Sequence, residues 1–340
     1  MINYIYQLVS PQVLSVEYTD ITPCEDKIIL RPLKMSVCQA DIRYYFGLRS
    51  RASLAKKLPM ALIHECCAEV VYDPTGTYKP GQTVIPVPNV PTRPEREGFF
   101  ENYSEQPHFL SSGYDGFMRE YVEMPVSRVV PADCIKNHNV AAFCELVSVA
   151  VHAFDRFDRA SHSERKNIGI WGDGSVAYCL ACVIKSLMPE CNLTVIGRNQ
   201  QKLDMYTFAD RVYADCDLPD DFSVDHAFEC CGGEGSADAI DGIIAHIKPQ
   251  GTVILMGVSE NKVGILTRMV LEKGLTLVGV SRSGKRDFER AVEIISDGVT
   301  EGRLSLIAED YGKVSSMDDI HAVFNKARTG LFKTVFDWNL

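Results

Sequence analysis

The sequence has no apolar run near the roughly 18 residues that cross a bilayer, and its longest apolar stretches, such as 176–184, have the length of a core helix. The N-terminus also lacks a basic segment followed by an apolar core, so no secretory signal is indicated. Without such a signal, the 12 cysteines, which are spread along the chain, are expected to be reduced thiols. We therefore expect a soluble, cytoplasmic protein with no membrane contact.

Basic residues are fewer than acidic residues. Lys and Arg number 35 against 45 Asp and Glu, which gives a net charge of −10. Such a surface repels nucleic acid and anionic membranes, and an anionic ligand would need a local basic patch. The length of 340 residues is comfortable for two domains, and a hydrophobic share of 46% is ordinary for a globular protein.

Two regions with different patterns follow one another. Up to about residue 145, short β-branched runs alternate with Pro, Gly, Asn and Asp, which indicates a β-rich region; the runs are 27–30, 68–71, 83–87 and 121–122. From about residue 166, strand and helix patterns alternate as in βαβ units with a parallel sheet. The expected strands are 167–171, 193–196, 224–228, 252–256, 275–280 and 334–338, and the expected helices are 176–188, 200–208, 288–295 and 317–329. The proline-rich stretch 88–107 indicates an exposed excursion.

A glycine-rich loop follows the strand predicted at 167–171. Glycine at its first two positions permits a tight turn and close approach of a pyrophosphate, and a small third residue lets the next helix pack on the strand. The helix N-terminus would direct N–H groups at the phosphates. A loop without a ligand is the alternative. The predicted cofactor-binding residues are Gly172, Gly174, Ser175, Val176 and Ala177.

The end of the next strand has no acidic residue. Folds that bind NAD usually carry Asp or Glu there for the ribose 2′-hydroxyl, whereas this chain has Ile196-Gly197-Arg198-Asn199, with Lys202 beyond. No carboxylate would repel a 2′-phosphate, and Arg198 can pair with one. We predict NADPH as the cofactor, with Arg198 and Lys202 at its 2′-phosphate. The alternative is a solvated surface arginine.

Three distant segments carry metal-binding groups. Cys38, His64 and Glu65 offer a thiolate, an imidazole and a carboxylate, which could form a zinc site with one open position. Glu145 could be a fourth ligand at rest or could exchange with water. Taken singly, a cysteine is more often a small core residue, so the metal site depends on the combination.

Together these segments resemble the zinc-containing medium-chain dehydrogenases over essentially the whole chain. Cys38 and Asp41 fit the G-x-C-x-x-D element, and His64-Glu65 fits G-H-E with Ile63 in place of glycine. Further matches are 113–121 to D-G-G-x-A-E-Y, 228–232 to V-F-E-C-x-G, and 249–257 to the turn beside the nicotinamide. The resemblance implies an α/β protein with a GroES-like β-rich catalytic domain (1–145 and 296–340) and a Rossmann doubly wound parallel-sheet cofactor domain (146–295).

Within this family the polyol (sorbitol-type) branch fits best. Glu145 stands where ethanol-type enzymes have a cysteine ligand, and Tyr44 matches an active-site tyrosine of the polyol branch. The stretch 88–107 lacks the four cysteines that hold a structural zinc in many relatives, so one catalytic zinc per chain is expected. Ala40 replaces the Ser or Thr that relays the alcohol proton, which must then leave through Glu65, Tyr44 or metal-bound water.

More narrowly, the chain resembles the bacterial ribitol-5-phosphate 2-dehydrogenases, for example at 57–60, 225–230 and 271–275. This implies reduction of D-ribulose 5-phosphate to D-ribitol 5-phosphate with zinc and NADPH. It also implies a cytidylyltransferase that turns the product into CDP-ribitol for teichoic acid or capsule, and a homodimer. The candidate partners of the substrate phosphate are Arg43, Arg49, Arg51, Lys57 and Arg282. Each of them could instead be a solvated surface charge.

Three other functions stay open. A general NAD(P)-dependent polyol dehydrogenase would share the whole site. A zinc-free quinone or enoyl reductase would have no use for Cys38, His64 and Glu65, and a non-catalytic binding protein would have no need of both sites. Cys179 and Cys182 have C-x-x-C spacing, but they fall on apolar helix positions and are expected to be core residues.

Overall fold

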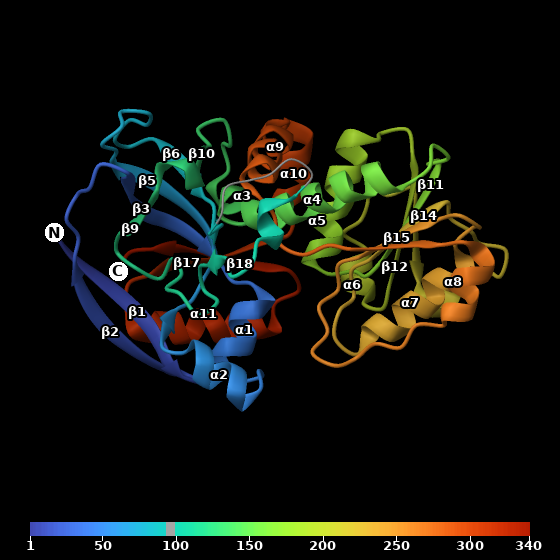
Figure 1. The fold of residues 1–340 in the computed structure, drawn as a ribbon, viewed down its shortest axis with the longest axis horizontal. Helices are drawn as coiled ribbons and strands as arrows, with labels where there is room; N and C mark the ends of the chain where they lie inside the picture. The colour runs from blue at the N-terminus through green and yellow to red at the C-terminus, as the bar shows by residue number, and fades with distance from the viewer. Residues whose placement is uncertain (93–98) are drawn as a thin grey trace. The chain divides into compact units, whose positions relative to one another are not determined.

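The computed structural model describes residues 1–92 and 99–340, which form two compact units (Figure 1). The first unit combines Met1–Ser148 with Ser283–Leu340, and the second is Val149–Arg282. The sequence predicts the second boundary at residue 295 instead. Residues 283–295 lie in the first unit because helix α9 (Lys285–Ser296) packs against strand β10 (Val129–Pro131) and helix α10 (Gly298–Ser305) of that unit.

The first unit is built on a seven-stranded sheet in the order β10-β6-β5-β3-β18-β17, with β9 paired to β3. Its strands are β3 (Lys27–Ser36), β5 (Glu65–Tyr72), β6 (Thr83–Pro86), β9 (Val122–Pro125), β10 (Val129–Pro131), β17 (Ala308–Val314) and β18 (Lys333–Trp338). A three-stranded sheet, β2-β1-β4, comprises β1 (Ile2–Ser10), β2 (Val13–Asp20) and β4 (Met60–Ala61), and β7 (Asn89–Val90) pairs with β8 (His108–Phe109). The β-rich character predicted for this region is confirmed.

The helices of this unit are short and lie between strands. They are α1 (Gln39–Tyr45), α2 (Arg51–Lys57), α3 (His138–Ala142), α9, α10 (Gly298–Ser305) and α11 (Met317–Thr329), and α4 (Cys144–Ala160) begins in this unit. Single 3₁₀ turns occur at Glu101–Tyr103 and Val126–Arg128. The helix and closing strand expected near the C-terminus are confirmed as α11 and β18.

The second unit contains six parallel strands in the order β13-β12-β11-β14-β15-β16. The strands are β11 (Asn167–Trp171), β12 (Asn192–Gly197), β13 (Arg211–Ala214), β14 (His226–Glu229), β15 (Thr252–Leu255) and β16 (Thr276–Gly279). The helices are α5 (Ser175–Leu187), α6 (Gln200–Leu203), α7 (Gly235–His246) and α8 (Thr267–Lys273), and a 3₁₀ turn spans Asp215–Asp217. This is the strand order of a Rossmann sheet, in which ligands bind where the order reverses, here between β11 and β14.

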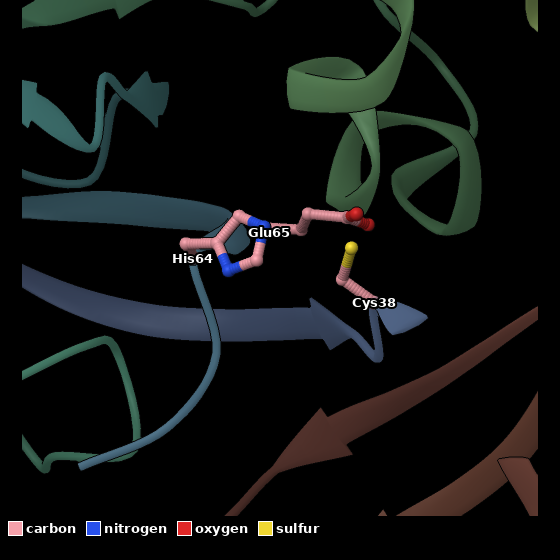
Figure 2. Close-up of side chains that lie close together, drawn as sticks. All are labelled: Cys38, His64 and Glu65. Atoms are coloured by element: carbon pink, nitrogen blue, oxygen red, sulfur yellow. The ribbon is translucent and has the colours of Figure 1, made fainter. Parts of the chain in front are cut away.

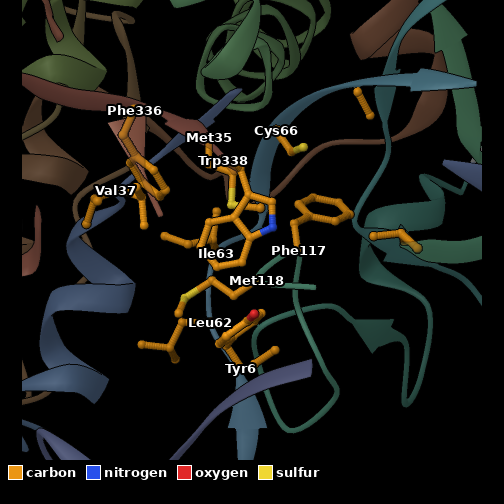
Figure 3. Packing of buried hydrophobic residues seen from close by; sticks show 14 of the residues in the cluster. Tyr6, Met35, Val37, Leu62, Ile63, Cys66, Phe117, Met118, Phe336 and Trp338 are labelled. Atoms are coloured by element: carbon orange, nitrogen blue, oxygen red, sulfur yellow. The ribbon is translucent and has the colours of Figure 1, made fainter. Parts of the chain in front are cut away.

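The core of the first unit is a cluster of buried hydrophobic residues that includes Ile63, Cys66 and Trp338 (Figure 3). The indole of Trp338 packs edge-on against Tyr6, with 5.3 Å between ring centroids. Ile63 and Cys66, which flank His64 and Glu65, are buried in the same cluster. Burying a large apolar side chain contributes roughly 1.5–3 kcal/mol, so this core fixes the backbone on both sides of the pair.

Two predictions of local structure are wrong. The helix expected at 200–208 ends at Leu203, because the next residues turn and the Tyr206 hydroxyl donates to the carbonyl of Gly174 (3.2 Å). The stretch 88–107 is not simply an exposed excursion. Asn89 and Asn102 are buried, and Glu101 forms an ion pair with Arg128 (2.8 Å); residues 93–98 of this stretch lie outside the described residues.

Among the described helices, none combines the length and the apolar character needed to cross a membrane.

Candidate metal and cofactor sites

Three side chains from two adjacent strands and a helix start meet in the first unit (Figure 2). Strand β3 pairs antiparallel with β5, and the register sets Ser36 opposite Glu65. Cys38 follows the end of β3 as the N-cap of α1, and His64 precedes β5, so the pairing brings them together. The ligand atoms of Cys38, His64 and Glu65 all lie within 4.8 Å of one another. The structure therefore brings together the three residues predicted as zinc ligands.

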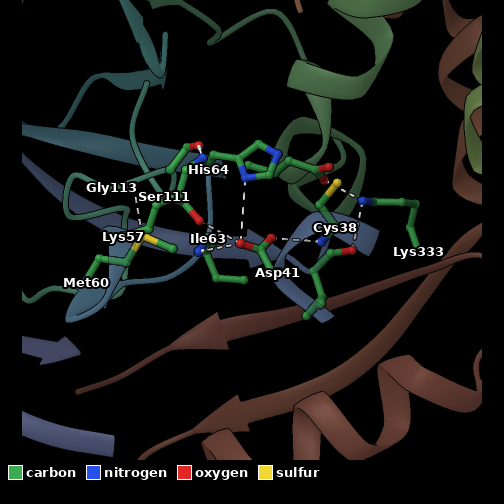
Figure 4. A network of polar contacts seen from close by, with 12 residues as sticks. Cys38, Asp41, Lys57, Met60, Ile63, His64, Ser111, Gly113 and Lys333 are labelled. Carbon is green, nitrogen blue, oxygen red and sulfur yellow. Dashed lines mark hydrogen bonds and ion pairs between the residues drawn. The ribbon is translucent and has the colours of Figure 1, made fainter. Parts of the chain in front are cut away.

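Asp41 organises the backbone around this cluster (Figure 4). It is fully buried, and it accepts hydrogen bonds from the N–H groups of Cys38 (3.1 Å) and Ile63 (3.0 Å) and from the Ser111 hydroxyl (2.7 Å). Its Oδ1 lies 3.7 Å from His64 Nδ1. Burial alone would raise the pKa of Asp41, but the charge of His64 and these hydrogen bonds hold it below its ordinary value. A carboxylate behind a ligand histidine fixes the orientation of the ring.

Burial and charge act on the pKa of His64 with signs opposite to those for Asp41. Burial alone lowers the pKa of the imidazole, but the charges of Asp41 and Cys38 raise it well above its ordinary value. The residue before it, Ile63, has a φ of 70°, a left-handed conformation that is unfavourable for a β-branched side chain. The first position of the G-H-E element is thus filled here by a strained, buried isoleucine.

Gly116, a glycine of the motif at 113–121, lies against the backbone that presents His64. A Cβ at this position would lie 2.3 Å from the carbonyl oxygen of Ile63 and 2.4 Å from that of Leu62. Only glycine lets the segment after Asp115 run so close to the backbone that presents His64. The motif glycine therefore supports the cluster from behind.

Glu65 has a buried cation beside it. Lys333, the first residue of β18, is almost fully buried, and its ammonium lies 2.6 Å from Glu65 Oε2 and donates to the carbonyl of Val37 (2.9 Å). Glu65 Oε1 is buried and accepts no hydrogen bond from the described residues. A buried carboxylate oxygen with no donor, next to a thiol and an imidazole, fits a zinc ligand set.

Glu145 lies in the first turn of α4 and is buried, but it is not one of the three side chains that converge. Its pKa is raised to about 7, chiefly by burial, with Glu65 adding repulsion and His64 and Lys333 opposing it. Glu145 therefore interacts electrostatically with the residues of the cluster.

The predicted phosphate-binding residues come from several different elements. Arg43 is half-buried on α1, and Arg282 belongs to the second unit and has a φ of 62°. Tyr44, in contrast, is buried on α1, and its ring lies under two cations: Arg49, at 4.8 Å from Cζ to the centroid, and Lys57, at 5.7 Å from Nζ.

The glycine-rich loop of the second unit has the geometry expected of a dinucleotide cradle. Gly172 has a φ of 135°, and a Cβ there would lie 2.9 Å from the backbone of Cys230. Gly174 is the N-cap of α5, and nothing would obstruct a Cβ at that point, so the space above the helix start is open. Ser175 and Val176 are half-buried in the first turn, and Ala177 is buried against the sheet. The loop leaves β11 at the reversal of strand order.

The expectation that no carboxylate lies near Arg198 is wrong. Asp238 of α7 lies 2.8 Å from the guanidinium and Asp215 lies 3.6 Å away. Asp238 lies on α7 and Asp215 in the 3₁₀ turn after β13. The residues at the end of β12 therefore give no sign that these two carboxylates lie near Arg198. Asp173, inside the glycine loop, accepts the N–H groups of Arg198 (2.7 Å) and Asn199 (2.8 Å). Lys202 is half-buried on α6.

Two further residues were missed by sequence reasoning. Lys333 had a signal, since it is a lysine immediately before an apolar closing strand. Glu229 is buried and accepts the N–H groups of Gly232 (3.0 Å) and Gly257 (2.8 Å), and so ties together the loops after β14 and β15. Cys179 and Cys182 are fully buried in α5, as expected of core residues.

Comparison with known proteins gives consistent matches. The alcohol dehydrogenase GroES-like domain matches residues 25–134. A ribulose-5-phosphate reductase of Streptococcus pneumoniae is 48% identical and covers 100% of this chain and 98% of its own, and one of Bacillus spizizenii is 44% identical with 100% of both covered. The crystal structure of Staphylococcus aureus TarJ in complex with NADPH superposes with a TM-score of 0.87 at 37% identity, with 100% of both chains covered.

Proposed function

Because the chain belongs to the medium-chain alcohol dehydrogenases, among the ribulose-5-phosphate reductases, we propose that it reduces D-ribulose 5-phosphate. In this reaction NADPH reduces the C2 carbonyl, and the product is D-ribitol 5-phosphate. One observation carries the proposal: the convergence of Cys38, His64 and Glu65 in a buried cluster. Relatives named for this activity match the chain over its full length.

The proposed metal is one zinc ion per chain, held by Cys38, His64 and Glu65, with Glu145 as the neighbour that exchanges with water. When bound, zinc supplies a Lewis acid for the carbonyl oxygen and NADPH supplies the hydride. Asp41 fixes the ring of His64 by its contact at Nδ1, which leaves the other ring nitrogen for the metal. Lys333 holds Glu65 by one oxygen and leaves the other available.

The proton that completes the reduction needs a carrier because Ala40 offers no hydroxyl. Burial raises the pKa of Glu145 to about 7, so its carboxyl is a further candidate carrier. Glu65, Tyr44 and metal-bound water, the routes considered from the sequence, are the other proposed carriers.

The cofactor is proposed to bind the second unit. Its pyrophosphate would lie on the loop of Gly172 and Gly174 and the N-terminus of α5, with Ser175, Val176 and Ala177 forming the first turn. Arg198, with Lys202 nearby, would bind the 2′-phosphate after exchanging its contacts with Asp238 and Asp215. The product is proposed to pass to a cytidylyltransferase for CDP-ribitol, in the cytoplasm, and the enzyme to act as a homodimer.

Initial rates of NADPH and NADH oxidation with ribulose 5-phosphate, ribulose and fructose test this function. We expect NADPH with the phosphorylated ketose to be preferred by at least tenfold in kcat/KM over every other pair. Equal or better rates with NADH and unphosphorylated sugars would contradict the proposal and identify a general polyol dehydrogenase. Metal analysis of the same sample should find one zinc ion per chain, and an active protein without zinc would exclude the zinc site.

A further inference from the structure

We propose that Lys57 and Arg49, both lying over the ring of Tyr44, form the subsite that binds the terminal phosphate of the substrate. This inference rests on the proposed function, because it assumes a phosphorylated ketose. A sugar phosphate has one dianionic end, and an enzyme of net charge −10 needs a local group of cations to hold it.

The two cations share one platform. Tyr44 is buried, and its ring lies 4.8 Å from the guanidinium carbon of Arg49 and 5.7 Å from the ammonium of Lys57. Cation–π attraction to one rigid, buried ring restricts where the charged ends of both flexible side chains can lie. Both charged ends are thus positioned against the same side chain, an arrangement that suits one anionic group in contact with both.

Lys57 is held by a hydroxyl rather than by a carboxylate. Its ammonium donates to Ser112 Oγ at 2.6 Å, and among the residues that the structure describes it forms no ion pair. Lysines 34, 185 and 248 each pair with an aspartate in contrast. An ammonium has three donors, so Lys57 keeps its charge and two donors for a ligand.

The subsite is tied to the metal cluster through neighbouring residues (Figure 4). Ser112 holds Lys57, while Ser111, the residue before it, donates to Asp41, whose other contacts include His64. Tyr44 stands on α1, whose N-cap is Cys38. Six residues of helix rise about 9 Å at 1.5 Å each, so one short helix and one loop set the separation between the cations and the ligand cluster on the scale of a small metabolite.

Lys57 and Arg49 are the two basic candidates for which a contact with the Tyr44 ring is described. Arg51, by comparison, is exposed at the start of α2.

The test compares ribulose 5-phosphate with unphosphorylated ribulose in variants of Lys57. Losing one charge-assisted contact to phosphate should lower kcat/KM for ribulose 5-phosphate by about 10- to 100-fold in Lys57→Met, mostly through KM, with the rate on ribulose changed less than twofold. Lys57→Arg should recover most of the loss. Lys56→Met, an exposed lysine on the same helix, is the matched control and should behave as wild type.

Inhibition by inorganic phosphate gives a second readout that needs no turnover of a sugar phosphate. Phosphate should compete with ribulose 5-phosphate in the wild type, and its inhibition constant should rise at least tenfold in Lys57→Met and in Arg49→Met. Ser112→Ala, which leaves the charge in place, should give an intermediate effect and serves if Lys57→Met does not fold.

The outcomes separate the two proposals. Equal losses on both sugars would make Lys57 a support for the metal cluster and overturn the subsite. An unchanged preference for ribulose 5-phosphate in both Met variants would overturn it as well, while the proposed function would stand. A wild type that does not prefer the phosphorylated sugar would overturn the proposed function, and the subsite with it.

Discussion

The two units differ in how they place charge at their proposed ligand sites. In the first unit, titratable groups are buried around one point and compensate one another: Asp41, His64, Glu65, Glu145 and Lys333. In the second unit, the cation predicted to select the cofactor, Arg198, is 62% exposed. Buried charges are costly when unpaired, whereas exposed pairs are screened and weak.

This contrast predicts where single substitutions act strongly. Removing a member of the buried cluster leaves its partners uncompensated, so the effects should be large and should depend on metal. Removing a surface carboxylate beside Arg198 should change cofactor preference slightly and leave the fold alone. The experiments below test the contrast, beginning with the largest effect.

Cys38→Ser should abolish zinc binding, since a serine hydroxyl is a poor zinc ligand. The Lewis acid contributes several kcal/mol to the barrier, so kcat/KM should fall by about 1000-fold or more. Metal content by elemental analysis and initial rates measure both effects. Cys134→Ser, at an exposed cysteine of the same unit, is the control and should retain zinc and activity. An active Cys38→Ser enzyme would show that the buried cluster is not a metal site.

Lys333→Met should destabilise the metal-free protein by about 3–5 kcal/mol, because Glu65 is left as a buried, unpaired charge. Zinc would compensate that charge, so the loss should be much smaller in the loaded protein. Urea unfolding with and without a chelator measures the difference. Lys34→Met, a lysine on β3 that pairs with partly exposed aspartates, should give a smaller loss that is independent of chelator. Equal losses in both forms of Lys333→Met would refute coupling between Lys333 and the metal.

Asp225→Asn probes a buried carboxylate with a purely structural role in the second unit. Asp225 accepts the N–H of Asn167 (2.7 Å) and pairs with Lys248 (2.6 Å). Burial alone would raise its pKa, but these contacts hold the pKa below its ordinary value. A depressed pKa stabilises the fold above the ordinary value of about 4, and this contribution is lost as the pH falls through the depressed pKa.

The variant should therefore be about 1–3 kcal/mol less stable than wild type at pH 7, and the difference should shrink as the pH falls below about 4. Denaturant unfolding across this range measures it. Asp221→Asn, at an exposed position nearby, should show no such pH-dependent difference. A difference that stays constant down to low pH would mean that Asp225 acts without its charge.

Asp238→Asn should have the smallest effect. Removing this carboxylate frees Arg198 for a 2′-phosphate, so NADPH should bind about two- to fivefold more tightly, more so at low salt, with NADH unchanged. Fluorescence titration of both cofactors measures it. Asp241→Asn, on the same helix and exposed, is the control. An equal change for NADH would show that Asp238 does not act through the 2′-phosphate.

Much of the fold followed from local patterns. The strands at 167–171 and 252–256 and the helix at 317–329 were predicted closely, because buried parallel strands and an amphipathic helix leave clear signals. The hairpin of β1 and β2 went unnoticed, since its second strand is largely exposed and does not alternate. No helix was predicted over the range of α4, and only Glu145 was singled out from that segment. Its helical period was overlooked.

The site could be predicted as far as its residue types allowed. Cys38, His64 and Glu65 were found by their combination, and the antiparallel pairing of β3 with β5 supplies the geometry that a sequence cannot show. The residues that pair with these site residues were harder to predict. Lys333 lies 268 residues after Glu65, and Asp238 lies 40 after Arg198, so only tertiary structure brings them together.

The catalytic sheet joins distant parts of the chain, which bears on how the protein is made. Phe336 of β18 pairs with Met35 of β3, 301 residues earlier. At 5–20 residues per second, a ribosome would take roughly 15–60 s to cover that interval. Throughout it, residues 34–36 lack their partner on the β18 side, and the cation that faces Glu65 has not yet been synthesised. The unit that begins first is completed last, so a nascent chain would carry an open strand edge that chaperones can recognise.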